Sequence, residues 1–71
     1  MREYTVIFER SGDSWGAYVP DLPVCVAVGK SRAEVERLIR EAIDLHIEDL
    51  KSKDEPIPEP SHFAASVSVA A

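Results

Sequence analysis

Hydrophobic residues recur at every second position in two stretches near the N-terminus, which is the spacing of half-buried β-strands. The first predicted strand runs from Arg2 to Glu9 and the second from Ser14 to Val19. A turn at Gly12, which can adopt a positive φ, joins them as antiparallel neighbours. A third strand, Val24 to Val28, is mostly apolar, which favours a central strand or one covered on both faces. Residues 20–23 include two prolines and are expected to form a rigid connection or a sheet corner.

The hydrophobic spacing changes to three and four residues between Ser31 and Lys51, which predicts one long amphipathic helix. Ser31 stands at the N-cap position and Glu34 follows three residues later, so the two form a capping box. The apolar positions cover an arc of about 200°, wider than one face of a surface helix requires. These positions are Val35, Leu38, Ile39, Ala42, Ile43, Leu45, Ile47 and Leu50. We expect either a helix seated deeply in the core, or one that packs against its own sheet and also against a partner.

The sequence after the helix divides into a polar, proline-rich spacer and an apolar segment. Residues 52–61 contain alternating prolines, which favour an extended path. Phe63 to Val69 then alternates in the manner of a last strand at a sheet edge. The order is β-β-β-α-β, so the predicted fold class is α+β: a three- to four-stranded, mainly antiparallel sheet with one long helix packed on one face. We interpret residues 1–71 as a single domain.

Length and charge narrow the classes of function. A chain of 71 residues is marginally stable alone and gains from oligomerisation, because a domain of this size buries only about 60 per cent of its unfolded surface. The net charge of −5 argues against binding nucleic acid, which needs clustered Lys and Arg, and fits a basic partner. Cys25 is the only cysteine, so an internal disulfide is excluded. With no signal peptide and no apolar run of membrane-spanning length, the sequence favours a cytoplasmic protein that binds no membrane.

Motifs that carry catalysis or bind a cofactor do not occur in the sequence. The three glycines form no phosphate-binding loop, and no nucleophile motif is present. Cys25, His46 and His62 are too widely separated to predict a metal site, and Cys25 is interpreted as a small buried hydrophobe. We therefore expect no cofactor, no metal ion and no enzymatic activity. His46, in the middle of the apolar arc, can be a packed histidine, a partner contact or a catalytic group, and the last requires a nucleophile or an acid near its ring.

Two residues of the predicted sheet also have two interpretations each. Trp15 is the only tryptophan, and it is interpreted as a core or self-association residue, or else as an anchor for a partner. Asp21 lies between a proline and a leucine. It is expected to fix that connection through an Asx-type hydrogen bond rather than to act as an acid.

Three blocks, in this order, carry a resemblance to a known family. They are WGAYVPDLP at 15–23 with Cys25 following, EAIDLHIEDL at 41–50, and EPIPEP at 55–60. Through these blocks the chain resembles the HicB family of antitoxins, the short forms in particular, over most of its length up to Pro60. The resemblance implies a partial RNase H-like fold and a non-enzymatic role in a toxin–antitoxin module. It also implies a partner: a small basic mRNA-cleaving ribonuclease of the HicA type, whose active site the antitoxin covers.

The sequence departs from the family pattern at two points. Val24 stands where the family usually has a glycine between the second proline and the cysteine, which restricts the backbone of that corner. Many HicB proteins also carry a C-terminal DNA-binding domain, and the sequence up to Ala71 contains none. Repression of its own gene by this chain alone is therefore not expected.

We predict a protein-binding module, a homodimer or a higher homo-oligomer, that neutralises a HicA-type toxin. The expected partner contacts are the acidic face of the helix and the residues near the hairpin and the proline corner. These residues are Glu41, Asp44 and Glu48, and Trp15, Tyr18 and Asp21. The alternative is an orphan homo-oligomeric interaction or structural protein of the same fold that has no toxin.

Overall fold

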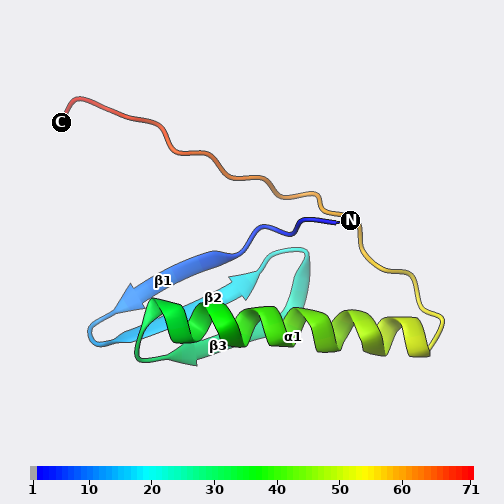
Figure 1. The fold of residues 1–71 in the computed structure, drawn as a ribbon. Coiled ribbons are helices and arrows are strands. Elements are labelled where there is room, and N and C mark those ends of the chain that lie inside the picture. Colours follow the sequence, from blue (N-terminus) through cyan, green and yellow to red (C-terminus); the bar gives the residue numbers. More distant parts are fainter. Residues whose placement is uncertain (1) are drawn as a thin grey trace.

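A computed structural model describes residues 2–71 and shows one sheet with a long helix on one of its faces (Figure 1). Three strands, β1 (Ile7–Ser11), β2 (Ser14–Val19) and β3 (Leu22–Gly29), precede the helix α1 (Arg32–Ser52). The strands lie in the order β1-β2-β3 and are antiparallel. The predicted α+β class and the order of three strands followed by one helix are confirmed.

The β1–β2 hairpin forms where the alternation predicts it. Gly12 has a φ of 60° at the turn, the left-handed conformation that glycine adopts without steric cost. The register pairs Ile7 with Tyr18 and Phe8 with Ala17. This register makes the predicted first strand too long, because β2 ends at Val19 and residues 2–6 have no strand beside them. They still contribute side chains to the core, as Tyr4 and Val6 do.

The third strand lies at the edge of the sheet, so the expectation of a central or doubly covered strand is wrong. β2 occupies the centre, because short connections join it to both neighbours. Alternate side chains of β3 face away from the core, and Val24, Val26 and Val28 are exposed. The apolar character of β3 therefore reflects a face of the sheet that residues 2–71 leave uncovered.

The core lies between the sheet and α1. Its buried residues come from β2, β3 and the first half of the helix: Ala17, Val19, Leu22, Cys25, Val35 and Ile39. Further along the helix the apolar arc is covered less completely. Leu38, Ile43 and Ile47 are half-buried and Leu45 is exposed. The helix therefore packs against its own sheet and leaves part of its apolar arc open, which differs from a helix seated deeply in the core. Packing of the open part against a partner stays a prediction.

The start of α1 is a capping box in a shifted form. The Glu34 backbone N–H donates to Ser31 Oγ at 3.1 Å, as predicted. The Glu34 carboxylate accepts from the backbone N–H of Lys30 at 2.7 Å, one residue earlier than the N-cap N–H that a capping box uses. Gly29 makes this approach possible, since a Cβ there would lie 3.0 Å from Val35 Cγ2 and would overlap the Glu34 carboxylate.

The end of α1 turns the chain back towards the N-terminus. Asp54 adopts a φ of 55°, its N–H donates to the Lys51 carbonyl, and the N–H of Glu55 donates to the Leu50 carbonyl at 2.9 Å. These are the two bonds of a Schellman motif, with aspartate at the position that usually holds glycine. The spacer then passes beside residues 2–5, where Tyr4 donates a hydrogen bond to the Pro58 carbonyl and Thr5 to the His62 carbonyl.

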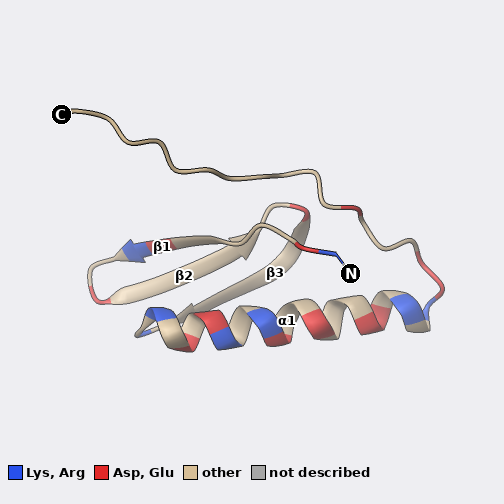
Figure 2. Ribbon diagram, turned by 45° about the horizontal axis from the view of Figure 1, so that its top comes forward, with Lys and Arg blue, Asp and Glu red and all other residues tan. Residues whose placement is uncertain are grey.

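The expected last strand does not join the sheet. Beyond His62 the chain is extended and runs towards the end of the molecule that holds the β1–β2 turn, apart from the sheet (Figures 1 and 2). All of residues 63–71 are exposed, Phe63 to 83%. We call residues 63–69 the tail segment. Its alternation is that of a strand, but no strand of residues 2–71 pairs with it.

Candidate protein-binding surfaces

Three of the six predicted contact residues lie together on α1. Glu41, Asp44 and Glu48 are all exposed, and their spacing of three and four residues places them on one side of the helix. Figure 2 shows that acidic residues dominate the second half of the helix. Glu41 forms a long ion pair with Arg37 at 3.5 Å, whereas Asp44 and Glu48 have no ion pair within residues 2–71.

Leu45 belongs to the same surface, although it is not one of the six predicted contact residues. Its side chain is 68% exposed and lies one helical turn from Glu41 and next to Glu48. Its position in the apolar arc, on the far side from Ile43, was the signal that could have identified it. We define the acidic stripe as Glu41, Asp44, Leu45 and Glu48: three carboxylates around one exposed apolar side chain.

Tyr18 lies on a different surface, the face of the sheet opposite the helix. It pairs with Ile7 on one side and Val26 on the other. Together with Val24 and Val28 it forms an exposed apolar area, which we call the outer sheet face. The structure therefore does not bring Tyr18 next to the acidic stripe.

Trp15 is half-buried on the helix side of the sheet, where it packs against the core. Of its two predicted roles, the structure shows the core contact. Its indole is thus not a free anchor within the single chain.

Asp21 binds the start of the tail rather than its own turn, so the expected Asx-type hydrogen bond is replaced by longer-range ones. Its carboxylate accepts from the Ser61 hydroxyl at 2.6 Å and the Ser61 backbone N–H at 2.9 Å. It also accepts from the His62 backbone N–H at 3.2 Å and lies 2.7 Å from His62 Nδ1. The Asp21 side chain is only 5% exposed. We call this arrangement the Asp21 clamp.

The hydrogen bonds of the clamp set the charge state of Asp21. The bonds from Ser61 and then those from His62 favour the ionised carboxylate and hold the pKa of Asp21 well below its usual range. A carboxylate with this many internal partners is a structural group. The clamp joins residues 61–62 to the β2–β3 connection, forty residues away in sequence.

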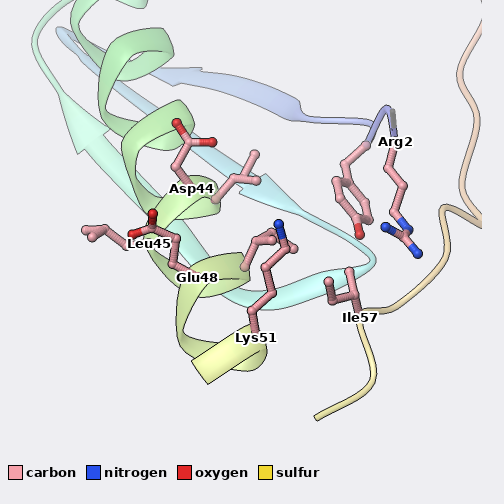
Figure 3. Close-up of a pocket in the computed structure, with 9 residues that line it drawn as sticks. Arg2, Asp44, Leu45, Glu48, Lys51 and Ile57 are labelled. Carbon is pink, nitrogen blue, oxygen red and sulfur yellow. The ribbon is translucent and has the colours of Figure 1, made fainter. Parts of the chain in front are cut away.

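An open groove runs between α1 and the N-terminal residues. It consists of two hollows of about 580 and 450 Å³ that share Arg2, Tyr4, Ile43 and Asp44. Figure 3 shows the larger one, with Lys51 and Glu48 on the helix and Arg2 and Ile57 across from them. The apolar lining of the groove comes from β1 with its preceding residues, from α1 and from the spacer: Tyr4, Val6, Phe8, Ile39, Ile43, Leu45, Ile47 and Ile57.

The groups considered for chemistry are not brought together. The half-buried His46 ring has no hydrogen-bond partner within residues 2–71, so it lacks the nucleophile or acid that the catalytic interpretation requires. Cys25 is buried, its Sγ lies 3.7 Å from the Ala42 carbonyl oxygen, and burial raises the pKa of its thiol. Over the same residues, no three His, Cys, Asp or Glu side chains converge as a metal site would require. None of the helices in this part of the chain has the length and hydrophobicity needed to cross a membrane.

The fold and these surfaces define a small α+β protein whose uncovered features are an acidic stripe, an apolar sheet face and a groove. Comparison with known proteins identifies the family. Residues 4–70 match the HicB-like antitoxins of bacterial toxin–antitoxin systems, and the chain belongs to this family. Membership implies a non-enzymatic regulatory role in such a system.

Curated relatives agree with this assignment. A UPF0150 protein of Thermoplasma acidophilum is 42% identical over 57 residues, covering 79% of this chain and 83% of the relative. A UPF0150 protein of Synechocystis is 33% identical over 93% of this chain and 85% of its own length. A 14.9 kDa protein from the rep–hol intergenic region of Haemophilus phage HP1 is 34% identical over 78% of this chain, but the match spans only 41% of that relative. No solved structure matches significantly, so the RNase H-like character of the fold stays a prediction.

Proposed function

We propose that this protein is an antitoxin that binds and neutralises a small, basic, mRNA-cleaving toxin of the HicA type in the cytoplasm. The proposal rests on membership of the HicB-like antitoxin family. The acidic stripe of α1 is the observation from which we propose particular residues as the toxin-binding surface.

The acidic stripe suits a basic partner in charge and in shape. The whole chain has a net charge of −5, and no Lys or Arg lies between Glu41 and Leu50. A surface of this sign accelerates the encounter with a cationic protein and aligns it before contact. Leu45 adds an apolar contact within the stripe, which can exclude water around the neighbouring charges.

The stripe is also held in place before any partner arrives. The opposite side of the same helix is fixed to the sheet by Val35 and Ile39, which belong to the buried core. Binding through a rigid helix face costs little conformational entropy, which favours affinity. Tyr18 on the outer sheet face is proposed as a separate contact. Trp15 and Asp21 are proposed to act indirectly, by supporting the sheet and its β2–β3 connection.

The test is an inhibition assay with the product of a small basic reading frame adjacent to the gene of this protein. That product, purified alone, is expected to cleave RNA, and the antitoxin is expected to abolish cleavage at a stoichiometric ratio. The double variant Asp44→Lys/Glu48→Lys should bind at least about tenfold more weakly, the equivalent of 1.4 kcal/mol. The charge-matched control Glu9→Lys/Glu3→Lys changes exposed carboxylates that precede α1 and should inhibit like the wild type.

Two results would contradict this proposal in different ways. Equal inhibition by the helix variant and its control would show that the acidic stripe is not the binding surface, but it would not contradict the antitoxin role. A neighbouring product that neither binds this chain nor cleaves RNA would remove the toxin partner itself.

The uncovered outer sheet face favours a second candidate, an orphan homo-oligomeric interaction or structural protein without a toxin. Monomeric proteins rarely leave a contiguous apolar surface exposed, and Val24, Val26 and Val28 form one here. On this alternative the protein recovered from its own cells at native abundance is a stable homo-oligomer with no small basic companion.

A further inference from the structure

The tail segment and the groove are complementary in chemistry but are not in contact within one chain. The tail segment has the strand alternation Phe63, Ala65, Val67, Val69, with smaller residues between, and Phe63, Val67 and Val69 are exposed. The groove beside β1 combines half-buried apolar side chains, which nothing covers fully, with charged ones. The half-buried apolar residues are Tyr4, Val6, Phe8 and Ile43, and the charged ones are Arg2, Glu36, Arg40 and Asp44. The tail segment thus has apolar side chains that pack against nothing, and the groove has apolar side chains that no segment covers.

The β1 edge next to the groove is free to accept a strand. β1 pairs with β2 on one side only, so its other side presents unpaired backbone N–H and C=O groups. A strand added there would place every second side chain over the groove towards α1 and the others on the outer sheet face. The tail segment would then direct its larger apolar residues to the half-buried Ile43 and Ile47, and Ser66 and Ser68 to the opposite face.

The Asp21 clamp occupies backbone donors at the point where the tail would begin to pair with the β1 edge of its own chain. The spacer passes beside Thr5, whose hydroxyl donates to the His62 carbonyl at 2.6 Å. At that point the backbone N–H groups of Ser61 and His62 both donate to Asp21 and are unavailable for pairing with β1. Beyond that point the chain runs towards the same end of the molecule as β1 but stays apart from the sheet, as both views show (Figures 1 and 2).

From this juxtaposition we propose that two copies of the chain exchange their tail segments, each adding residues 63–69 as a fourth strand to the β1 edge of the other and filling its groove. Of the two free edges of the sheet, β1 and β3, only the β1 edge borders the groove. Two exchanged tails would therefore fill both grooves, and the assembly closes with twofold symmetry. The exchange completes the predicted fourth strand in trans. It does not depend on a toxin, so it stands or fails separately from the antitoxin function.

The first test compares the mass in solution of three full-length chains. The wild type is expected at twice the 7.9 kDa chain mass by light scattering at micromolar concentration. Val67→Asp places a charge in the groove and should shift the protein to a monomer. Ser66→Asp adds the same charge one residue away on the opposite side of the strand and should remain a dimer. Circular dichroism checks that all three retain the same helix content.

The second test distinguishes exchange from a tail that folds back on its own chain. A nitroxide is attached to the new cysteine of a Cys25→Ala/Ser68→Cys variant. This chain is unfolded and refolded together with a second chain that is labelled with ¹⁵N and carries no nitroxide. Different affinity tags on the two chains confirm that mixed dimers have formed. Exchange predicts broadening of the ¹⁵N amide signals of residues 6–9 in the other chain. A monomeric wild type, equal behaviour of the two aspartate variants, or mixed dimers without broadening would each overturn the exchange.

Discussion

Single residues at the two ends of the sheet fix how the chain enters and leaves the α+β body. Gly29 lies where β3 meets the helix cap, and the Glu34 carboxylate occupies the space that a Cβ would need. Asp21 lies at the β2–β3 connection and holds the start of the tail. Neither residue is a chemical group of an active site, yet each determines the position of an element.

Gly29→Ala is expected to lower the free energy of unfolding by about 1 kcal/mol, the typical cost of losing a helix cap, because the new Cβ displaces Glu34 from the Lys30 N–H. Gly16→Ala is the matched control. Its Cβ would meet only the Ala27 carbonyl oxygen at 3.7 Å and Val28 at 3.9 Å, which is ordinary contact. Urea denaturation of the two variants measures the difference, and equal stabilities would show that the cap does not need this space.

The Asp21 clamp is expected to weaken in acid. Because the pKa of Asp21 in the folded protein lies below its ordinary value of 3.8, the clamp stabilises the protein above that value, and the contribution is lost as the pH falls through the lowered pKa. Protection of the Ser61 and His62 amides from hydrogen exchange should therefore be lost at low pH. Asp21→Asn should lower their protection at neutral pH too, and Asp13→Asn, in the exposed hairpin turn, should leave it unchanged.

At the scale of elements, the periodic segments could be predicted and the long-range contacts could not. The alternation of Ser14–Val19 and the capping pair Ser31 and Glu34 depend on local physics, and both appear in the structure. The position of β3 at an edge depends on which strands pair with each other. The apolar sequence of β3 is compatible with a central strand as well as with an edge strand.

The candidate site shows the same division between local and distant determinants. The helical spacing of Glu41, Asp44 and Glu48 was enough to place them on one surface. The role of Asp21 was not predictable, because its partner Ser61 is forty residues away and no periodicity connects them. Leu45 was counted as one of many apolar helix positions, and only the packing of the helix shows that it remains exposed.

The turn at the end of α1 can be tested by substitution, because Asp54 has a left-handed conformation that glycine adopts more readily. Asp54→Gly is expected to raise the free energy of unfolding by about 0.5–1 kcal/mol, and Asp54→Val, whose β-branch is poorly compatible with a positive φ, to lower it. Thermal denaturation monitored by circular dichroism gives both signs in one experiment. Two variants that shift the midpoint in the same direction would contradict the assignment of the Schellman turn.

At the scale of the whole molecule, the proposed exchange makes the sheet, groove and tail parts of an assembly larger than one chain. If tails are exchanged, unfolding separates two chains, so the thermal midpoint should rise with protein concentration. Each tenfold increase adds about 1.4 kcal/mol to the free energy of unfolding per dimer. Val67→Asp should unfold at a midpoint independent of concentration, while Ser66→Asp should follow the wild type. A concentration-independent midpoint for the wild type would be inconsistent with a dimer that unfolds as a unit.

The exposed tail segment also connects the abundance of the protein to its lifetime. Proteases bind their substrates as extended, accessible chains, and residues 63–71 have that form in a copy without a partner. On the proposed exchange, pairing withdraws this peptide from cleavage, so the fraction of vulnerable molecules rises as the protein becomes scarce. When synthesis of the protein stops and its concentration falls, the rate constant of its degradation would then increase. The protein would disappear faster than a constant first-order rate predicts.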